Sequence, residues 1–412
     1  MPKLERLLGL LVCAFAIALS FRITVTWIVL IAGLVIWAIW LFMRFREDRE
    51  SKRMLAVGPL LVPIVLYVLT VAISGIGRHE PAFTGKEFCE NLKTLRPLIV
   101  YFWAFDIFKR LPKLRLPAAL AMLIFSSLSG FVAAVQQIFD WHPWTEKYLQ
   151  GTGFMSEPMA YSGVMQVFAL LALGIFATGG FCRLRAPFNN RYLYLVLLCG
   201  NLFGLFFSSE RSAWFGFVVA TIVATALVSW RAMATTAAGL SAAAVAAWFF
   251  VPVIKTRLMP MFTGQADPGV TARLQIWHQA YTEFLKSPLT GIGTTKFPRI
   301  RIEAATELGQ DSLAHAHSNI LQVLSTAGII GLASYIWIVI CSLVLAVKHM
   351  FRNTQASSRF QSSKQRSERG LALGAFAAVL SLTVSGLAEY NFGTGQVRLV
   401  LWFVLALLGS ES

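Results

Sequence analysis

The feature that most constrains this chain is a series of apolar stretches that are long enough, or nearly long enough, to cross a lipid bilayer. Of its 412 residues, 57% are hydrophobic and 14% are charged, and the mean hydropathy is +0.65. A soluble domain has about 25% charged residues, and about 20 apolar residues in a helix span the hydrocarbon core. Because a single helix satisfies its own backbone in lipid, we expect an all-α polytopic membrane protein.

We predict about 12 transmembrane helices in one integral membrane domain that covers residues 1–412. The first follows a short basic start, and we expect it to remain uncleaved because no small-residue cleavage site follows it. The fourth and the twelfth are short. The predicted spans are 7–21, 23–43, 55–75, 97–108, 117–138, 161–181, 192–207, 213–229, 232–253, 319–347, 370–388 and 399–409.

Lys and Arg are divided unevenly between the loops on the two sides. The side that holds the N-terminus carries 21 of the 36, although its loops are mostly short. Cytoplasmic loops are enriched in basic residues in this way, so we expect both termini, and the loop 348–369, to be cytoplasmic. These loops are 1–6, 44–54, 109–116, 182–191, 230–231 and 348–369.

Composition also excludes several functions. In a membrane protein the net charge of +16 indicates basic cytoplasmic loops and contact with anionic lipids, so we expect membrane lipids and no nucleic acid as partners. The five cysteines form no CxxC pair, which argues against a structural disulfide or a zinc site. Neither a phosphate-binding loop nor a DxD motif is present, and acidic residues are sparse within the spans, which argues against a proton-coupled pump.

One loop is much longer than the others. Residues 254–318 separate the ninth and tenth spans and are expected to form a large periplasmic loop that contains short helices, and loops of this length are usually functional. Within it, "VTARLQIWHQAYTEFLKSP" has apolar residues at helical spacing and predicts an amphipathic helix. We expect Thr271 to cap its start and Pro288 to end it. The Gly- and Thr-rich "LTGIGTTKF" that follows predicts a turn.

Two arginines are candidates for substrate binding on the outer side. Arg211, in "SSERSAW", falls at the outer interface, where an arginine either faces a polar cavity or reaches out to lipid phosphates. Its neighbours Ser209 and Glu210 favour a binding role because they can fix the guanidinium. Arg273 opens the predicted amphipathic helix and, taken alone, is typical of a solvated surface. Trp277, one turn later, is more typical of a core or an interface than of a sugar platform.

His315 and His317 lie directly before the tenth span, in "AHAHSNILQ". A single interfacial histidine is most often structural, but a neutral imidazole can also take a proton from a hydroxyl as a general base. Two histidines one residue apart could bind a metal, yet the only carboxylate near them in sequence is Asp311. We therefore predict no metal site here.

These segments together resemble the O-antigen ligase and polymerase superfamily. The likeness rests on an Arg before a Trp and a Pro-x-x-Gly-x-Gly turn in "RLQIWHQAYTEFLKSPLTGIGTTKF", and on "AHSNILQVLSTAGIIGL" with its His, Leu-Gln and Gly-x-x-Gly. "SSERSAW" resembles an earlier element, so the matched core covers about 208–335. Ser318 stands where the family usually has Asn, and Asn319 follows. In length, spans and lack of an appended soluble domain, the chain is most similar to the O-antigen ligases of lipopolysaccharide assembly.

The resemblance implies a metal-independent, ATP-independent glycosyltransferase with no cofactor. It would move a glycan from undecaprenyl diphosphate to a sugar hydroxyl of lipid A–core, at the periplasmic face of the bacterial inner membrane. It assigns the base to His317, with His315 as the alternative, and diphosphate binding to Arg211 and Arg273. Supporting roles would fall to Ser209, Glu210, Trp277, Asn319 and Gln322. An O-antigen polymerase, a protein O-glycosylating ligase and a transporter of lipid-linked glycan remain alternatives.

Overall fold

The computed structural model describes residues 2–47, 56–77, 83–143, 150–179, 190–250, 259, 268–297, 315–352 and 363–410. These residues form helices joined by turns, with one isolated bridge between Phe21 and Phe154 and no strand among them. The helices are α1 (Pro2–Ala18), α2 (Ile23–Glu47), α3 (Leu61–Ala72), α4 (Gly85–Thr94), α5 (Ile99–Arg110), α6 (Arg115–Phe139), α7 (Pro158–Thr178), α8 (Arg191–Phe207), α9 (Arg211–Val228), α10 (Trp230–Phe250), α12 (Pro268–Lys286), α14 (Asn319–Phe351), α15 (Ser363–Ser385) and α16 (Gly395–Gly409).

The predicted class, an all-α membrane protein, is confirmed. Each of the twelve predicted spans contains a helix, and seven helices in the described part of the chain are long and apolar enough to cross a membrane. Those seven are α2, α6, α7, α9, α10, α14 and α15. Three shorter apolar helices, α3, α8 and α16, have 12, 17 and 15 residues. The number twelve therefore stays a prediction.

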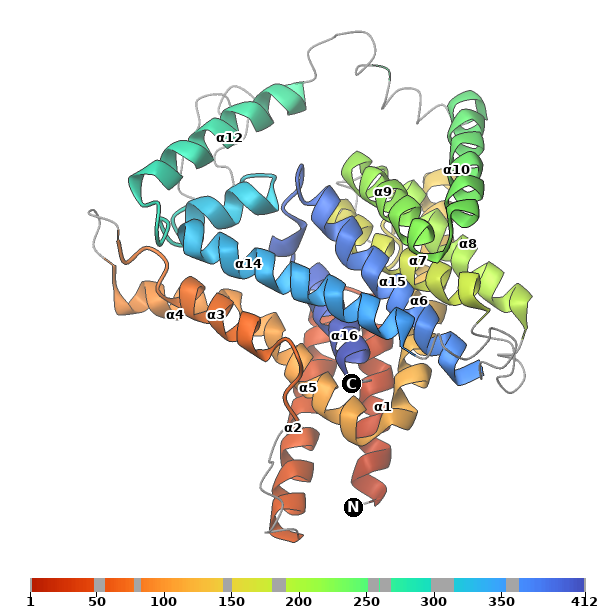
Figure 1. Cartoon of the computed structure of the whole chain (residues 1–412), viewed down its shortest axis with the longest axis horizontal. Helices are drawn as coiled ribbons and strands as arrows, with labels where there is room; N and C mark the ends of the chain where they lie inside the picture. The colour runs from red at the N-terminus through yellow and green to blue at the C-terminus, as the bar shows by residue number, and fades with distance from the viewer. Residues whose placement is uncertain are drawn as a thin grey trace.

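Helices α7 and α15 form the centre of the bundle (Figure 1). They approach closely because glycines face each other, and a Cβ on Gly174 would lie 2.3 Å from the carbonyl oxygen of Gly370. Small residues allow such contact between helices in lipid, where apolar burial alone gives little drive to associate. Within its most apolar stretch α7 is 83% buried and α10 is 0% buried, so α10 presents its apolar side chains outward.

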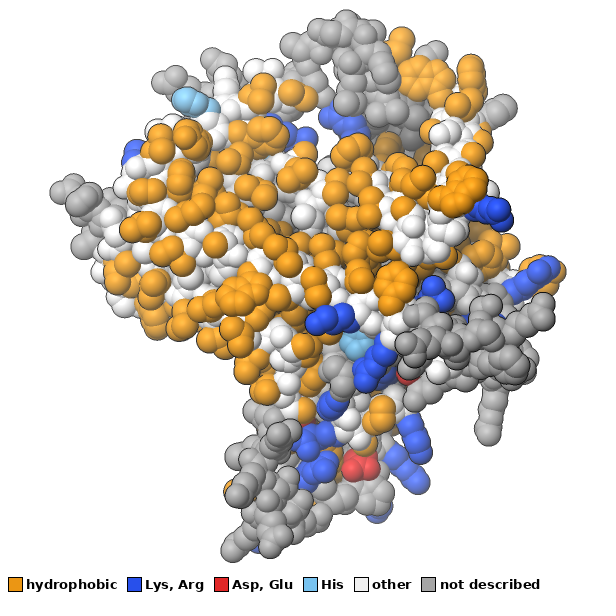
Figure 2. Space-filling view, viewed as in Figure 1, with side chains coloured by type: hydrophobic (Ala, Val, Ile, Leu, Met, Phe, Trp, Pro, Cys, Tyr) orange, Lys and Arg blue, Asp and Glu red, His pale blue; other side chains and the backbone are white. Residues whose placement is uncertain are grey.

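Lys and Arg gather at one end of the molecule. Apolar side chains cover most of the face in Figure 2, and Lys and Arg gather below them near α1 and α2. The N-terminus lies at this end, away from α12 (Figure 1). Arg115 donates to the carbonyl oxygen of Leu407 at 2.9 Å, so the end of α16 lies beside the basic loop 109–116. This arrangement agrees with the predicted orientation, which itself stays a prediction.

The amphipathic helix predicted in the long loop is present as α12. It begins at Pro268, so Thr271 lies inside its first turn and the predicted cap at Thr271 is wrong. It ends at Lys286, two residues before Pro288, as expected from the helix-breaking proline. A small separate core, made of Ile276, Ala280, Ile292, Phe297 and Ala316, attaches it to the rest. Of the predicted loops 254–318 and 348–369, residues 254–258, 260–267, 298–314 and 353–362 lie outside the described residues.

The tenth predicted span, 319–347, is interrupted. Within α14, Gly328 has φ 69° and ψ −171°, so the backbone leaves the helix there and resumes it at once. Glycine alone adopts this conformation easily. A short segment, 319–327, next to the histidines is thereby separated from a long one, 329–351.

The glycine turn after α12 fills this interruption. Gly291 and Gly293 both have positive φ, and a Cβ on Gly291 would lie 2.3 Å from the backbone of Thr326. The broken helix leaves backbone groups without helical partners, which is tolerated at membrane depth only where other protein satisfies them. Three backbone hydrogen bonds do so, from Ile292 N to Ser325 O (2.9 Å), from Gly293 N to Thr326 O (3.0 Å) and from Ile329 N to Pro288 O (2.9 Å).

Candidate active site

The two histidines lie in a short loop that is fixed on both sides. Trp277 of α12 donates its indole N–H to the carbonyl oxygen of Ala316 at 3.0 Å. The N–H of Ala316 donates to the side-chain oxygen of Gln322 at 2.6 Å, and Ala316 is fully buried. His317 has φ 46°, which is uncommon for a residue other than glycine. The loop therefore holds His317 in a conformation that it would rarely adopt alone.

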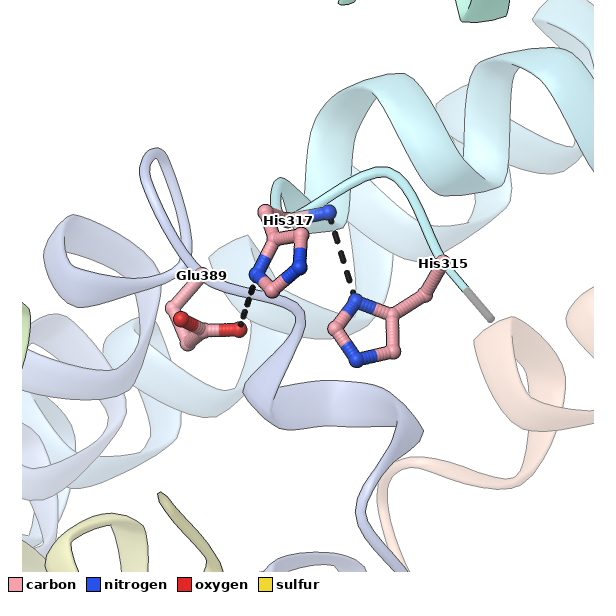
Figure 3. Close-up of side chains that lie close together, drawn as sticks. All are labelled: His315, His317 and Glu389. Carbon is pink, nitrogen blue, oxygen red and sulfur yellow. Dashed lines mark hydrogen bonds and ion pairs between the residues drawn. The ribbon is translucent and has the colours of Figure 1, made fainter. Parts of the chain in front are cut away.

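His317 contacts a carboxylate from a distant part of the sequence (Figure 3). Its Nδ1 lies 3.2 Å from Oε1 of Glu389, which belongs to the loop between α15 and α16. The same oxygen accepts the backbone N–H of Tyr390 at 3.0 Å. Glu389 is 3% exposed, and a buried carboxylate needs partners of this kind to remain charged.

Arg273 reaches the other oxygen of the same carboxylate. Its Nη2 lies 3.5 Å from Oε2 of Glu389, and its side chain is 32% exposed. Glu389 thus joins α12 to the histidine loop, and it brings together two residues that the sequence predicted independently. The guanidinium remains open enough to contact a bound anion.

Glu389 determines which ring nitrogen of His317 can act as a base. Burial raises the pKa of Glu389, but the hydrogen bond and charge of His317, with the N–H of Tyr390, outweigh it and leave the pKa below its ordinary value. A carboxylate that is ionised can only accept, so Nδ1 of His317 carries the proton in this contact. The neutral ring then has its lone pair at Nε2, the arrangement that a general base requires.

His315 lies against His317 but has a different environment. The ring centroids are 4.3 Å apart, and Nδ1 of His315 accepts the backbone N–H of His317 at 3.4 Å. Burial, helped by the charges of His317 and Arg273 and opposed by that of Glu389, lowers the pKa of His315 to about 4. His315 is therefore neutral near pH 7, and no carboxylate among the described residues forms a hydrogen bond with it, so the geometry favours His317 as the base.

Asn319 fastens the histidine loop to the segment that carries Glu389. Its Nδ2 donates to Oδ1 of Asn391 at 2.7 Å, and its Oδ1 accepts the N–H of Phe392 at 3.0 Å. Its own backbone N–H donates to the carbonyl oxygen of Gly386 at 2.7 Å. Asn319 is buried, so a substrate does not reach it. Its hydrogen bonds instead fix the distance between His317 and Glu389.

Arg211 stands at the first position of α9, after Ser209 and Glu210. Ser209 is buried and has φ 57°, so the chain turns sharply before the helix. A Cβ on Gly216 would lie 2.6 Å from the carbonyl oxygen of Ser381, near the end of α15. The start of α9, where Arg211 stands, is therefore at the end of the bundle from which Glu389 extends.

Glu389 is the site residue that sequence reasoning missed. It is the one acidic residue between the last two apolar spans, in "GLAEYNFGTGQ", but it is 72 residues away from His317. The available signal was a polar cluster, Glu-Tyr-Asn, in the short loop between α15 and α16. No spacing rule connects that loop to the histidines.

The fold also assembles a group that could hold a metal ion. One ligand atom from each of His315, His317 and Glu389 lies within 4.8 Å of the others, and two imidazoles with a carboxylate are ligands that Zn²⁺ uses. The prediction of no metal site relied on sequence spacing, and the fold supplies the carboxylate that was missing there. Arg273 beside Glu389 opposes a second cation, so we keep the metal-independent interpretation as a prediction.

Comparison with known proteins agrees with these motifs. Residues 193–336 match the family model described as O-antigen ligase. The match runs from α8 into α14 and includes Arg211, Arg273, both histidines and Gly328, while Glu389 lies beyond it. No curated protein matches the chain.

The fold and the site define a polytopic membrane protein with a histidine–carboxylate–arginine cluster at one end of its helix bundle. The family match over residues 193–336 confirms the resemblance to the O-antigen ligase superfamily that the motifs predicted.

Proposed function

We propose that this protein is an O-antigen ligase. It transfers a glycan from undecaprenyl diphosphate to a sugar hydroxyl of lipid A–core, at the periplasmic face of the bacterial inner membrane. The observation that carries this proposal is the contact of His317 and Arg273 with the two oxygens of Glu389. A base, the group that orients it and a guanidinium for an anionic leaving group then lie at one place.

The reaction is a direct displacement. The acceptor hydroxyl oxygen attacks the anomeric carbon of the donor glycan, and its proton moves to Nε2 of His317. The bond from the anomeric carbon to the diphosphate oxygen breaks, and the electron pair leaves with the diphosphate. Because attack and departure occur on opposite faces, the anomeric configuration inverts. Glu389 stabilises the imidazolium through Nδ1.

The arginines stabilise the leaving group. The diphosphate gains negative charge as it departs, and guanidinium groups can bind it with paired, charge-assisted hydrogen bonds. Arg273 is held near the base by a contact of 3.5 Å to Glu389, and Arg211 lies at the same end of the bundle. A lipid diphosphate is already an activated donor, so neither ATP nor a metal ion is required in this mechanism.

Purified protein in lipid vesicles tests the proposal, with a labelled lipid-diphosphate glycan as donor, in parallel reactions with and without chelator. A ligase attaches the label to lipid A–core. Label that appears instead on a longer lipid-linked glycan would assign the protein as an O-antigen polymerase, and label on added protein would assign a protein O-glycosylating ligase. Loss of transfer on adding chelator would replace the arginine mechanism with a metal-dependent one.

A transporter of lipid-linked glycan is the candidate from a different class. It would move labelled donor across the vesicle membrane without changing it chemically. His317→Ala distinguishes the two, because a transferase loses its product while a transporter continues to move substrate. Movement of donor in both forms of the protein, with no transferred glycan in either, would contradict the proposed function.

A further inference from the structure

A cavity of about 480 Å³ lies beside the histidine loop, and the mechanism above does not use it. His315 and Tyr390 form one of its walls, and neither Arg211 nor Arg273 is among the described residues that line it. Its other walls come from the turn between α1 and α2, from residues 155–160 and from residues 393–396. Ligand pockets in proteins have volumes of about 300–1,000 Å³, so this one has room for one or two sugar rings.

The walls combine apolar surface with hydrogen-bonding groups of both kinds. Phe21 contributes an aromatic ring, stacked on Phe154 with 4.8 Å between centroids. Arg22 supplies donors, and the carboxylate of Glu157 supplies acceptors, while Thr394 offers a hydroxyl. A saccharide has C–H faces that pack on aromatic rings and hydroxyls that both donate and accept. One positive and one negative side chain give the cavity little preference for an anion, in contrast to the arginine side of the site.

Hydrogen bonds hold these walls in place without a ligand. The side-chain N–H₂ of Gln396 donates to the carbonyl oxygen of Leu19 at 2.8 Å and to Oγ1 of Thr26 at 3.1 Å, which fixes the turn between α1 and α2. Gln136 of α6 accepts the N–H groups of Thr152 and Gly153 at 2.9 and 2.8 Å. The segment that leads to Glu157 is therefore fixed as well, and a preformed pocket binds without the cost of ordering its walls.

The imidazole ring of His315 lies between the cavity and His317, the proposed base. A ligand that touches His315 lies within a few ångströms of His317, because the two imidazole centroids are 4.3 Å apart. We propose that this cavity binds the saccharide end of the acceptor and presents its hydroxyl to His317, with His315 as a wall of the acceptor site. The proposal rests on the proposed function, and it divides the site into an acceptor cavity and a separate arginine side for the donor diphosphate.

Two variants test the cavity, and a third serves as a matched control. Glu157→Gln removes an exposed carboxylate from the wall, and Ser156→Trp fills the space beside it. Glu90→Gln makes the same charge change on α4, outside the cavity lining. Loss of a hydrogen bond to a charged group typically weakens binding about 10-fold or more. We therefore expect Glu157→Gln to raise KM for lipid A–core about 10-fold, with KM for the lipid-linked donor unchanged.

Direct binding separates this proposal from the proposed function. Soluble core oligosaccharide, released from lipopolysaccharide, is titrated calorimetrically into each purified protein, and free O-antigen oligosaccharide is titrated in parallel. We expect the core oligosaccharide to bind the wild type and Glu90→Gln, and to bind Glu157→Gln at least 10-fold more weakly. Unchanged binding in Glu157→Gln, or weakened binding of the O-antigen oligosaccharide alone, would overturn the acceptor assignment. Normal binding without any transfer by the wild type would instead contradict the proposed function.

Discussion

Two buried carboxylates, Asp106 and Glu389, differ in the lengths of their contacts and in the exposure of their partners. Asp106, in α5, is 0% exposed and accepts from the indole N–H of Trp37 (2.9 Å), the backbone N–H of Ala56 (2.8 Å) and Nε of Arg110 (2.7 Å). Glu389 is 3% exposed, but its contacts to His317 and Arg273 are longer, 3.2 and 3.5 Å.

The exposure of the partners separates the two sites further. Arg110, which pairs with Asp106, has a side chain that is 15% exposed, whereas the side chains of His317 and Arg273 are 24% and 32% exposed. Short bonds to enclosed donors fix a carboxylate as part of the framework. Longer contacts to groups that a substrate can reach leave those groups able to change partners during a reaction. Burial alone therefore does not distinguish the two carboxylates, but the exposure of their partners does.

The largest expected effect concerns the base beside Glu389. His317→Ala should lower the rate of glycan transfer by about 10²- to 10⁴-fold, because a general base typically contributes this much. The thermal unfolding midpoint should stay near that of the wild type, since the surrounding loop is held by Trp277 and Gln322. Transfer is measured on purified protein with saturating donor and acceptor. Activity retained in His317→Ala but lost in His315→Ala would assign the base to His315.

The arginine partners give the next largest contrast. Arg273→Ala should remove about 2.7–4 kcal/mol of leaving-group stabilisation, as for loss of one oxyanion donor. Arg273→Lys should restore little of it, because lysine lacks the bidentate fork. Arg110→Ala is the matched control at Asp106: it should lower the amount of folded protein and leave turnover per folded molecule unchanged. Equal losses of turnover in the two alanine variants would remove the distinction between the sites.

Neutralising each carboxylate should have a smaller effect than removing its partner. We expect a loss of rate at Glu389 and a loss of stability at Asp106. Glu389→Gln should slow transfer roughly 10- to 100-fold, the kinetic equivalent of a charge-assisted hydrogen bond of about 1.5–3 kcal/mol. Asp106→Asn should instead destabilise the fold by about 1–3 kcal/mol with normal turnover. Rates per folded molecule and unfolding midpoints are compared for both. A stability loss without a rate loss in Glu389→Gln would make Glu389 a framework residue like Asp106.

The smallest expected effect is a dependence of stability on pH that originates at His315. The pKa of His315 is about 4 in the folded state, against 6.5 for an ordinary histidine. Between these values the unfolded chain binds a proton that the folded chain does not, so stability falls as pH decreases from 6.5 to 4. The slope contributed by one group is at most about 1.4 kcal/mol per pH unit. His315→Gln should weaken the dependence of the thermal unfolding midpoint on pH between pH 7 and 5. An unchanged dependence would contradict the assignment of this effect to His315.

The sequence predicted what depends on local pattern. Each of the twelve predicted spans contains a helix, with bounds that differ by up to seven residues, because the length and hydropathy of a stretch determine whether it is stable in lipid. His317 and Arg273, whose side chains contact Glu389, were also found, because they lie within recognisable motifs. Glu389 was not, since its contact with His317 spans 72 residues. The interruption at Gly328 was missed for the same reason, because the groups that stabilise it come from the turn at 288–293.

The break at Gly328 has a consequence for exchanging segments between this protein and related chains. The glycine turn and the segment 319–327 of α14 share backbone hydrogen bonds, so they form one structural unit although about 30 residues of chain separate them. A chimera with a junction between residues 293 and 325 would join two halves that were never fitted to each other, even if both donors were active. A graft intended to carry substrate preference should therefore include residues 287–331 as one cassette, together with 386–392, which bonds to its histidine end through Asn319.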